Sequence, residues 1–237
     1  MATKKRLKKE LTPTVDLELD LDFVGVSVFT DDNGYPEHAA IFISKGEESH
    51  IFHFDSENLK ENKINECDQF LTKVLQSIQP FEVGAFLVQC KEALNNPAPG
   101  YHFFIDGSYI NGQGKYVSEL GIPVYRMTCV GFCLALLKGW FEEDYLMYED
   151  WRADNTINPA TLQQQLSELM ALYPNFSEEE LSRNIRRIKP IEYIASGYFN
   201  KRPIRKANTD TIIVNLKDIV KEWHDKTFVD ETTPSSI

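Results

Sequence analysis

No long hydrophobic run occurs in the sequence, and no apolar segment approaches the roughly 20 residues that a helix needs to cross a bilayer. Positive charge is also scarce, because 25 Lys and Arg stand against 36 Asp and Glu and give a formal net charge of −11. This balance disfavours nucleic acid or an anionic membrane surface as the main partner. The Lys-rich residues 4–9 lead into an acidic stretch instead of the apolar core of a secretory signal, so we expect a cytoplasmic protein.

Cysteine is equally sparse. The chain has four among 237 residues: Cys67, Cys90, Cys129 and Cys133. In the cytoplasm we expect these to be thiols and not a disulfide framework. No second pair matches Cys129 and Cys133, and residues three apart on a strand, such as His50 and His53, point to opposite faces, so we expect no metal site. The Gly-rich stretch 107–114 lacks a phosphate-loop pattern, and no cofactor is expected.

Composition predicts a globular α+β protein in three parts. Hydrophobic residues make up 42% of the chain and aromatic residues 12%, which suits a packed core. We expect residues 1–14 to form a basic flexible tail, 15–150 an α+β domain, and 151–237 a mainly helical extension packed on it. Capping residues predict helix starts in this extension, at Asn158-Pro159 and at Ser177. Its helices are a candidate surface for a protein partner.

Two strands joined by a tight turn are predicted around residue 46. Residues 38–44 and 49–54 are rich in apolar and aromatic side chains, and the segment between them is typical of a hairpin turn. With the turn centred on residues 46 and 47, the numbers of paired residues sum to 93, so Phe42 faces Ile51. The alternation in residues 15–30 predicts a further strand, whereas apolar spacing in 57–79 predicts a helix.

Cys129 is the first candidate for chemistry. Thr128 is a good N-cap residue, and the apolar run that follows it predicts a helix whose first turn contains Cys129. The partial positive charge and the backbone N–H groups of such a helix start stabilise a thiolate and can line an oxyanion hole. Gly131 leaves room for a substrate backbone to approach. We therefore interpret Cys129 as a nucleophile, with Thr128 and Gly131 as binding residues.

His38 is the second candidate. It begins the first strand of the predicted hairpin and is followed by small and then apolar residues. A histidine can take the proton of a cysteine thiol and return it to a leaving group. Each of these two segments would also suit an ordinary buried residue. The order of the two along the chain, with His38 before Cys129, strengthens the interpretation of the pair as base and nucleophile.

This combination resembles the circularly permuted papain-like superfamily, which includes permuted NlpC-type peptidases and lecithin:retinol acyltransferase-like enzymes. The family pattern is a His that opens an apolar strand and a distant Cys-x-x-Phe that opens a helix, here His38 and Cys129-Val130-Gly131-Phe132. Thr128 replaces the Asn that commonly precedes the nucleophile. The resemblance covers about residues 22–140 and implies a papain-like fold, with a small antiparallel sheet packed on the nucleophile helix. It further implies Cys129 as nucleophile, His38 as base and a polar residue on the neighbouring strand.

Hairpin geometry ranks the candidates for that third residue. In the predicted register His38 faces Asp55 and Ala40 faces His53, which places His53 diagonal to His38 over a small side chain. A slip by one residue would bring His50 to this face instead. We favour His53 as the residue that orients the imidazole, with Asp55 and His50 as alternatives.

These observations predict a thiol hydrolase that cleaves an amide, isopeptide or ester bond through an acyl-enzyme. A protein or peptide substrate fits the absence of an export signal. One alternative is a catalytically silent papain-like module with a binding or regulatory role. A second alternative is an acyltransferase.

Overall fold

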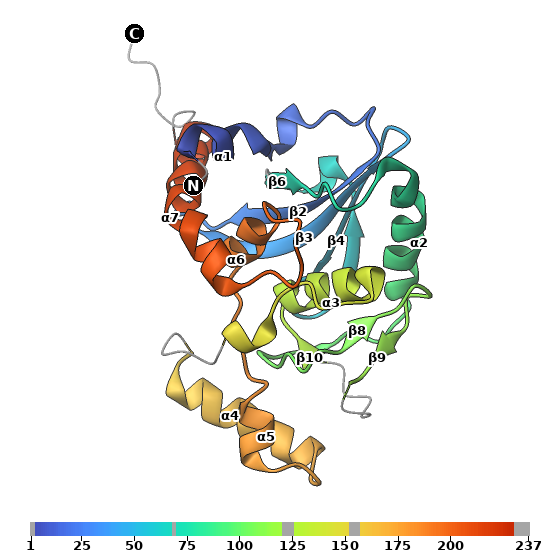
Figure 1. The fold of residues 1–237 in the computed structure, drawn as a ribbon, viewed down its shortest axis with the longest axis vertical. Coiled ribbons are helices and arrows are strands. Elements are labelled where there is room, and N and C mark those ends of the chain that lie inside the picture. Colours follow the sequence, from blue (N-terminus) through green and yellow to red (C-terminus); the bar gives the residue numbers. More distant parts are fainter. Residues whose placement is uncertain (1–2, 68–69, 120–125, 152–156, 230–237) are drawn as a thin grey trace.

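The computed structural model describes residues 3–67, 70–119, 126–151 and 157–229 (Figure 1). The strands are β1 (Leu11–Pro13), β2 (Phe23–Thr30), β3 (Pro36–Lys45), β4 (Glu48–Phe54), β5 (Leu59–Asn62), β6 (Leu71–Val74), β7 (Gly100–Tyr101), β8 (Tyr109–Ile110), β9 (Tyr116–Val117) and β10 (Arg126–Met127). The helices are α1 (Lys4–Glu10), α2 (Val83–Ala93), α3 (Cys129–Phe141), α4 (Pro159–Leu172), α5 (Glu178–Ser182), α6 (Pro190–Ser196) and α7 (Lys206–His224).

The central layer is a six-stranded antiparallel sheet in the order β1-β6-β2-β3-β4-β5. Helices α2, α3 and α6 lie against it, with α7 beside α6 (Figure 1). The α+β class predicted from the sequence is therefore confirmed. Two short pairs, β7 with β10 and β8 with β9, lie outside the sheet on the far side of α3.

The β3–β4 hairpin has the predicted register. Phe42 pairs with Ile51 and Ile41 with Phe52, so the paired numbers sum to 93. The turn residues Gly46 and Glu47 both have positive φ, at 58° and 68°. This left-handed pair is the backbone conformation that a two-residue turn needs to match the twist of its strands.

The two faces of the sheet carry separate hydrophobic clusters. On β3, Ala39 and Ile41 belong to the main core, which also contains the buried residues of α3. Ala40 and Phe42 point the other way, into a smaller cluster around Phe70 that the N-terminal loop helps to cover. Because side chains alternate along a strand, every β3 residue is assigned to one face or the other.

Two sequence predictions were wrong. Residues 57–79 contain β5 and β6 and not a helix, because β6 pairs with both β1 and β2 and the sheet overrides the local spacing. The basic segment expected to be a flexible tail forms α1 with Leu7 fully buried. The Tyr198 hydroxyl donates to the Leu7 carbonyl at 2.9 Å, which ties this helix to the C-terminal part of the chain.

The C-terminal helices divide between two cores. Residues of α6 and α7, such as Ile194 and Leu216, are buried in the main core beside the sheet. Helices α4 and α5 instead surround a separate small cluster with Phe104, and they extend away from the sheet (Figure 1). Asn158 and Ser177 cap α4 and α5 as the sequence predicted.

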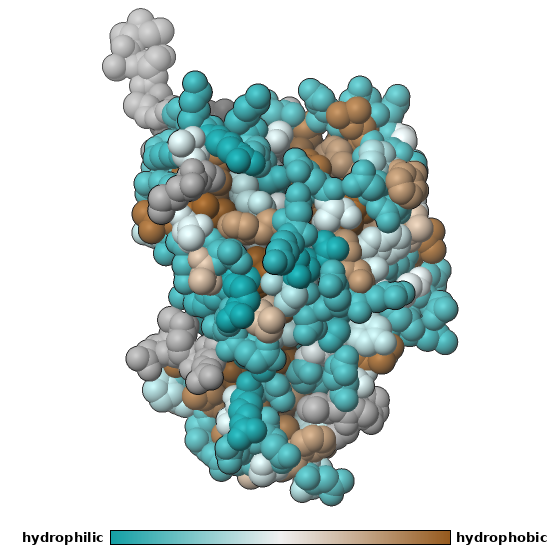
Figure 2. Space-filling view, in the orientation of Figure 1, coloured by the Kyte–Doolittle hydropathy of each residue, from teal (hydrophilic) through white to brown (hydrophobic). Residues whose placement is uncertain are grey.

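The helices of the described residues are all too short or too polar to cross a membrane. Hydrophilic side chains cover most of the face shown in Figure 2, and the hydrophobic ones on it are scattered. Scattered apolar residues of this kind are normal on a protein surface.

Close packing of α3 on β8 gives a first prediction. A Cβ added at Gly139 would lie 1.6 Å from the carbonyl oxygen of Ile110, so the helix would have to move away from the strand. We expect Gly139→Ala to lower the free energy of unfolding by about 3 kcal/mol. The matched control is Gly84→Ala in α2, where the added Cβ meets nothing closer than 3.6 Å. Urea denaturation of both variants checks this, and equal stabilities would contradict the packing described.

Candidate functional site

Cys129 is the first residue of α3, and the helix follows β10 after a single intervening residue. That residue, Thr128, has extended backbone angles, and its hydroxyl accepts the Gly131 N–H at 3.0 Å. The N-cap predicted from the sequence is thus present. It leaves the N–H groups of Cys129 and Val130 at the helix start, close enough to the sulfur to lower its pKa.

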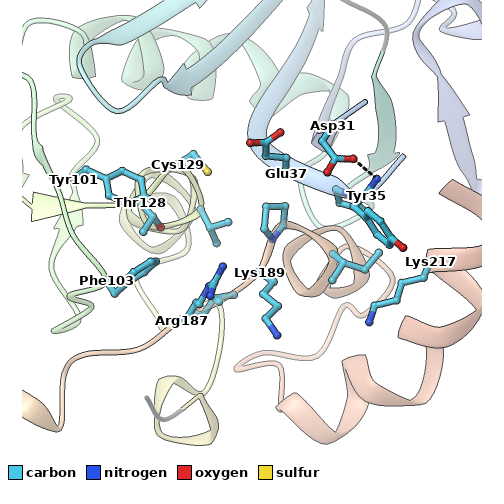
Figure 3. Close-up of a pocket in the computed structure, with 15 residues that line it drawn as sticks. Asp31, Tyr35, Glu37, Tyr101, Phe103, Thr128, Cys129, Arg187, Lys189 and Lys217 are labelled. Atoms are coloured by element: carbon cyan, nitrogen blue, oxygen red, sulfur yellow. Dashed lines mark hydrogen bonds between the residues drawn. The ribbon is translucent and has the colours of Figure 1, made fainter. Parts of the chain in front are cut away.

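A cavity of about 400 Å³ opens beside this helix start (Figure 3). Its wall is formed by residues from β3, α3, the segments around residues 101 and 188, and α7. Figure 3 shows the Cys129 sulfur turned toward Glu37, with Arg187 pointing toward both from the opposite wall. The charged residues on the wall are Asp31, Glu37, Arg187, Lys189 and Lys217.

The surroundings of Cys129 favour the neutral thiol over the thiolate. Its side chain is 8% exposed, and burial raises the pKa of the thiol. The backbone N–H groups of Ala39, Val130 and Cys129 itself oppose this shift, whereas the carboxylate of Glu37 adds to it and raises the pKa further. The expected stabilisation by the helix start exists, but burial outweighs it.

Glu37 lies at a β-bulge, on the face of β3 that carries the cavity. Phe29 pairs with His38 but the next residue, Thr30, pairs with Pro36, so Glu37 is the extra residue on β3. A bulge leaves one residue outside the ladder. Glu37 still lies on the same face as Ala39 two residues later, which is the face that α3 covers, and it lines the cavity with Cys129.

His38 and His53 come together on the opposite face of the sheet. The Nε2 atom of His38 lies 2.9 Å from Nδ1 of His53, and Nε2 of His53 lies 2.9 Å from the amide oxygen of Asn62. Both rings contact Phe29, which packs on Phe70 in the smaller cluster. The predicted diagonal contact of the two histidines is present, and Asn62 extends it into a chain of three side chains.

This arrangement separates the imidazole of His38 from the thiol. Ala39 faces the main core with Cys129, so the side chain of His38, one residue earlier, lies on the other face. The structure thus brings His38 to His53 and does not pair its ring with Cys129. Sequence reasoning placed both histidines correctly in the hairpin but did not ask which face α3 covers.

The other predicted residues also have clear positions. Gly131 is buried and lies outside the lining of the cavity beside Cys129. A Cβ added at Gly131 would lie 3.0 Å from the Cβ of Met127. His50 stacks on Phe52 and bonds to Glu61 at 2.6 Å, on the face opposite His53. Asp55 caps its own turn by accepting the backbone N–H groups of residues 57 and 58.

Burial of the histidine pair gives a second prediction. Burial, and next the neighbouring His53, lower the pKa of His38 to about 4 from a usual value of 6.5. The unfolded chain then binds more protons than the folded one between these values, so stability falls as the pH drops from about 6.5 toward 4. We expect His38→Gln to lose less stability than the wild type over this window. Urea denaturation at both ends measures the difference, and identical slopes would contradict it.

Sequence reasoning missed Glu37, Arg187 and Tyr101 on the cavity wall. Tyr101 pairs with Met127 through β7 and β10, and so stands directly beside the start of α3. Arg187 lies 58 residues beyond Cys129 in the chain, and no local pattern distinguishes it from its neighbours. Alternation along the predicted strand puts Glu37 on the face of Ala39, but the sequence reasoning did not establish that α3 covers this face.

Among the described residues, no group of three or more His, Cys, Asp or Glu side chains is placed to hold a metal ion. Comparisons of the chain with protein-family models, with curated proteins and with solved structures found no match.

Proposed function

We propose that this chain is a cysteine-dependent hydrolase of the permuted papain-like type, which cleaves an amide, isopeptide or ester bond in a protein or peptide. One observation carries the proposal. The Cys129 thiol stands at the start of α3, opens into the cavity, and is contacted by the backbone N–H of the residue directly after His38. A nucleophile, a set of N–H donors and a cavity therefore coincide.

The chemistry follows from these groups. A base removes the thiol proton, and the sulfur attacks the carbonyl carbon to give a tetrahedral oxyanion. The N–H groups of Cys129 and Val130 stand where they can donate to that oxygen. The leaving group departs with the proton held by the base, and water then cleaves the thioester and regenerates the thiol.

His38 is the base in this proposal, and its backbone is close to the sulfur although its ring points away. Standard bond lengths place its Cα only about 2.4 Å from the Ala39 nitrogen that contacts Cys129. The bulge at Glu37 supplies a route, because moving a bulge by one residue exchanges the faces of neighbouring side chains. Substrate binding would then turn the imidazole toward the thiol, with His53 as the positioning residue in the resting state.

A catalytically silent binding module is the second candidate, and a specific observation favours it. The pKa of Cys129 is raised by burial and by Glu37, and the ring of His38 contacts the cluster on the other face. A thiol in these surroundings is a poor nucleophile at neutral pH. In this case the cavity binds its ligand without cleaving it.

Acyl transfer to Cys129 distinguishes the two candidates. The protein is incubated with p-nitrophenyl acetate at pH 7.5, and peptide mass spectrometry then locates any acetyl group among the four cysteines. The hydrolase proposal expects acetylation at Cys129 ahead of the half-buried Cys67, with sustained release of p-nitrophenol. Acetylation at Cys67 alone would refute the hydrolase and leave the binding module.

A further inference from the structure

Three cationic side chains line the cavity, and of these Arg187 points toward Cys129 (Figure 3). Arg187, Lys189 and Lys217 line the cavity of a protein whose net charge is −11. Of the two acidic residues there, Asp31 accepts the backbone N–H groups of its own turn at 3.0 and 2.8 Å. Glu37 is then the acidic residue left to face a ligand. Cationic side chains therefore outnumber acidic ones on the cavity wall, in contrast to the chain as a whole.

Backbone hydrogen bonds fix the position of Arg187 relative to Cys129. The Arg186 N–H donates to the Phe103 carbonyl at 2.7 Å, and the His102 N–H donates to the Met127 carbonyl at 3.2 Å. These bonds connect the segment before α6 to the strand that leads into α3. The guanidinium carbon of Arg187 also lies 5.5 Å from the centre of the Phe103 ring, a cation–π contact that orients it.

The pKa of Tyr101 is affected by both the guanidinium of Arg187 and the thiol of Cys129. Burial raises the pKa of the Tyr101 hydroxyl, Cys129 raises it further, and Arg187 lowers it. Both groups are therefore near enough to act on the same oxygen. A ligand that fills the cavity contacts the sulfur and the guanidinium together.

From this geometry we infer that the substrate carries a carboxylate close to its scissile carbonyl, and that Arg187 binds this carboxylate. The inference rests on the proposed function, because it takes the ligand in the cavity to be a substrate. A guanidinium offers two parallel donors that match the two oxygens of a carboxylate. Phosphate fits the same fork, but Glu37 on the facing wall disfavours a dianion, so the structure favours the monoanionic group.

Two alkylating reagents test the inference without any turnover. Iodoacetate carries a carboxylate, whereas iodoacetamide is neutral. The quantity measured is the rate of alkylation by iodoacetate divided by the rate by iodoacetamide at the same thiol. Because both reagents react with the thiolate, the fraction of thiolate cancels in this ratio. We expect this ratio to be higher at Cys129 than at Cys67 of the same molecule. Arg187→Gln should lower the ratio at Cys129 by about 2- to 5-fold, as expected for a partly exposed charge pair. Glu37→Gln should raise it by a similar factor.

Arg183→Gln is the matched control, because Arg183 is exposed and pairs with Glu179 outside the cavity. The ratio should not change in this variant, and Arg187→Lys, which keeps the charge but loses the paired donors, should give a ratio between those of the wild type and Arg187→Gln. Should Arg187→Gln fail to fold, raising the salt concentration on the wild type must lower the ratio at Cys129 more than at Cys67. A ratio at Cys129 that ignores Arg187, Glu37 and salt would overturn the inference, even if the protein hydrolyses esters.

The carboxylate could belong to an acidic side chain or to a chain terminus. N-acetylglutamic acid α-amide presents only the first, and N-acetylalanine only the second. Whichever slows iodoacetamide labelling of Cys129 identifies the source, and Arg187→Gln must remove that protection. If neither compound protects the thiol, Arg187 does not recognise a carboxylate and the inference is wrong. Absence of turnover with intact protection would instead remove only the hydrolase proposal.

Discussion

Replacement of Cys129 by alanine is expected to abolish the hydrolysis of p-nitrophenyl acetate while the protein stays folded. Cys129 combines a nucleophilic sulfur with N–H donors at a helix start on the cavity wall, so the loss should be on the order of 10³-fold or more. The cost in unfolding free energy should be about 1 kcal/mol or less, because only one sulfur atom is removed at the cavity edge. Initial rates and urea denaturation measure the two effects.

Cys133→Ala is the control for this variant. Cys133 lies one turn further along α3, is fully buried, and its thiol interacts with the Tyr193 hydroxyl. We expect this variant to lose about 1–2 kcal/mol of stability and to keep the activity. The opposite pattern, with activity intact in Cys129→Ala and lost in Cys133→Ala, would assign Cys129 to the core alone.

Local features of the site were predictable from the sequence. Thr128 caps α3 because its hydroxyl bonds within its own turn, and the hairpin register follows from a turn two residues long. The contact between His38 and His53 followed from that register. Each of these depends on residues that are neighbours in the chain or across one tight turn.

Features set by distant segments were not predictable. The bulge at Glu37 depends on the pairing of β3 with β2, and α1 packs on the C-terminal part of the chain through the buried Leu7 and the Tyr198 bond to its carbonyl. Arg187 reaches the cavity through backbone bonds between segments more than 80 residues apart. Hydrophobic periodicity carries no information on such pairings, and it gave the wrong element for residues 57–79 for the same reason.

Loss of the imidazole in His38→Ala is expected to lower kcat for p-nitrophenyl acetate by about 10²- to 10⁴-fold, the usual contribution of a general base. The same variant should leave the pH dependence of Cys129 alkylation in the ligand-free protein unchanged. The reason is that the resting ring bonds to His53 on the other face of the sheet, away from the thiol. His53→Ala, which removes only the resting partner, should have a smaller effect on kcat.

Alkylation by iodoacetamide from pH 5 to 10, followed at Cys129 by mass spectrometry, separates the possible results. A resting thiol with a raised pKa reacts slowly at neutral pH and shows no acidic limb. If the wild type instead stays reactive below pH 7 and His38→Ala loses this reactivity, thiol and imidazole already form an ion pair in the ligand-free protein. The hydrolase proposal would survive that result, but the bulge would then sit one residue further along β3 in solution. A variant with full kcat would remove His38 as the base altogether and leave Glu37, whose carboxylate raises the pKa of the thiol, as the next candidate.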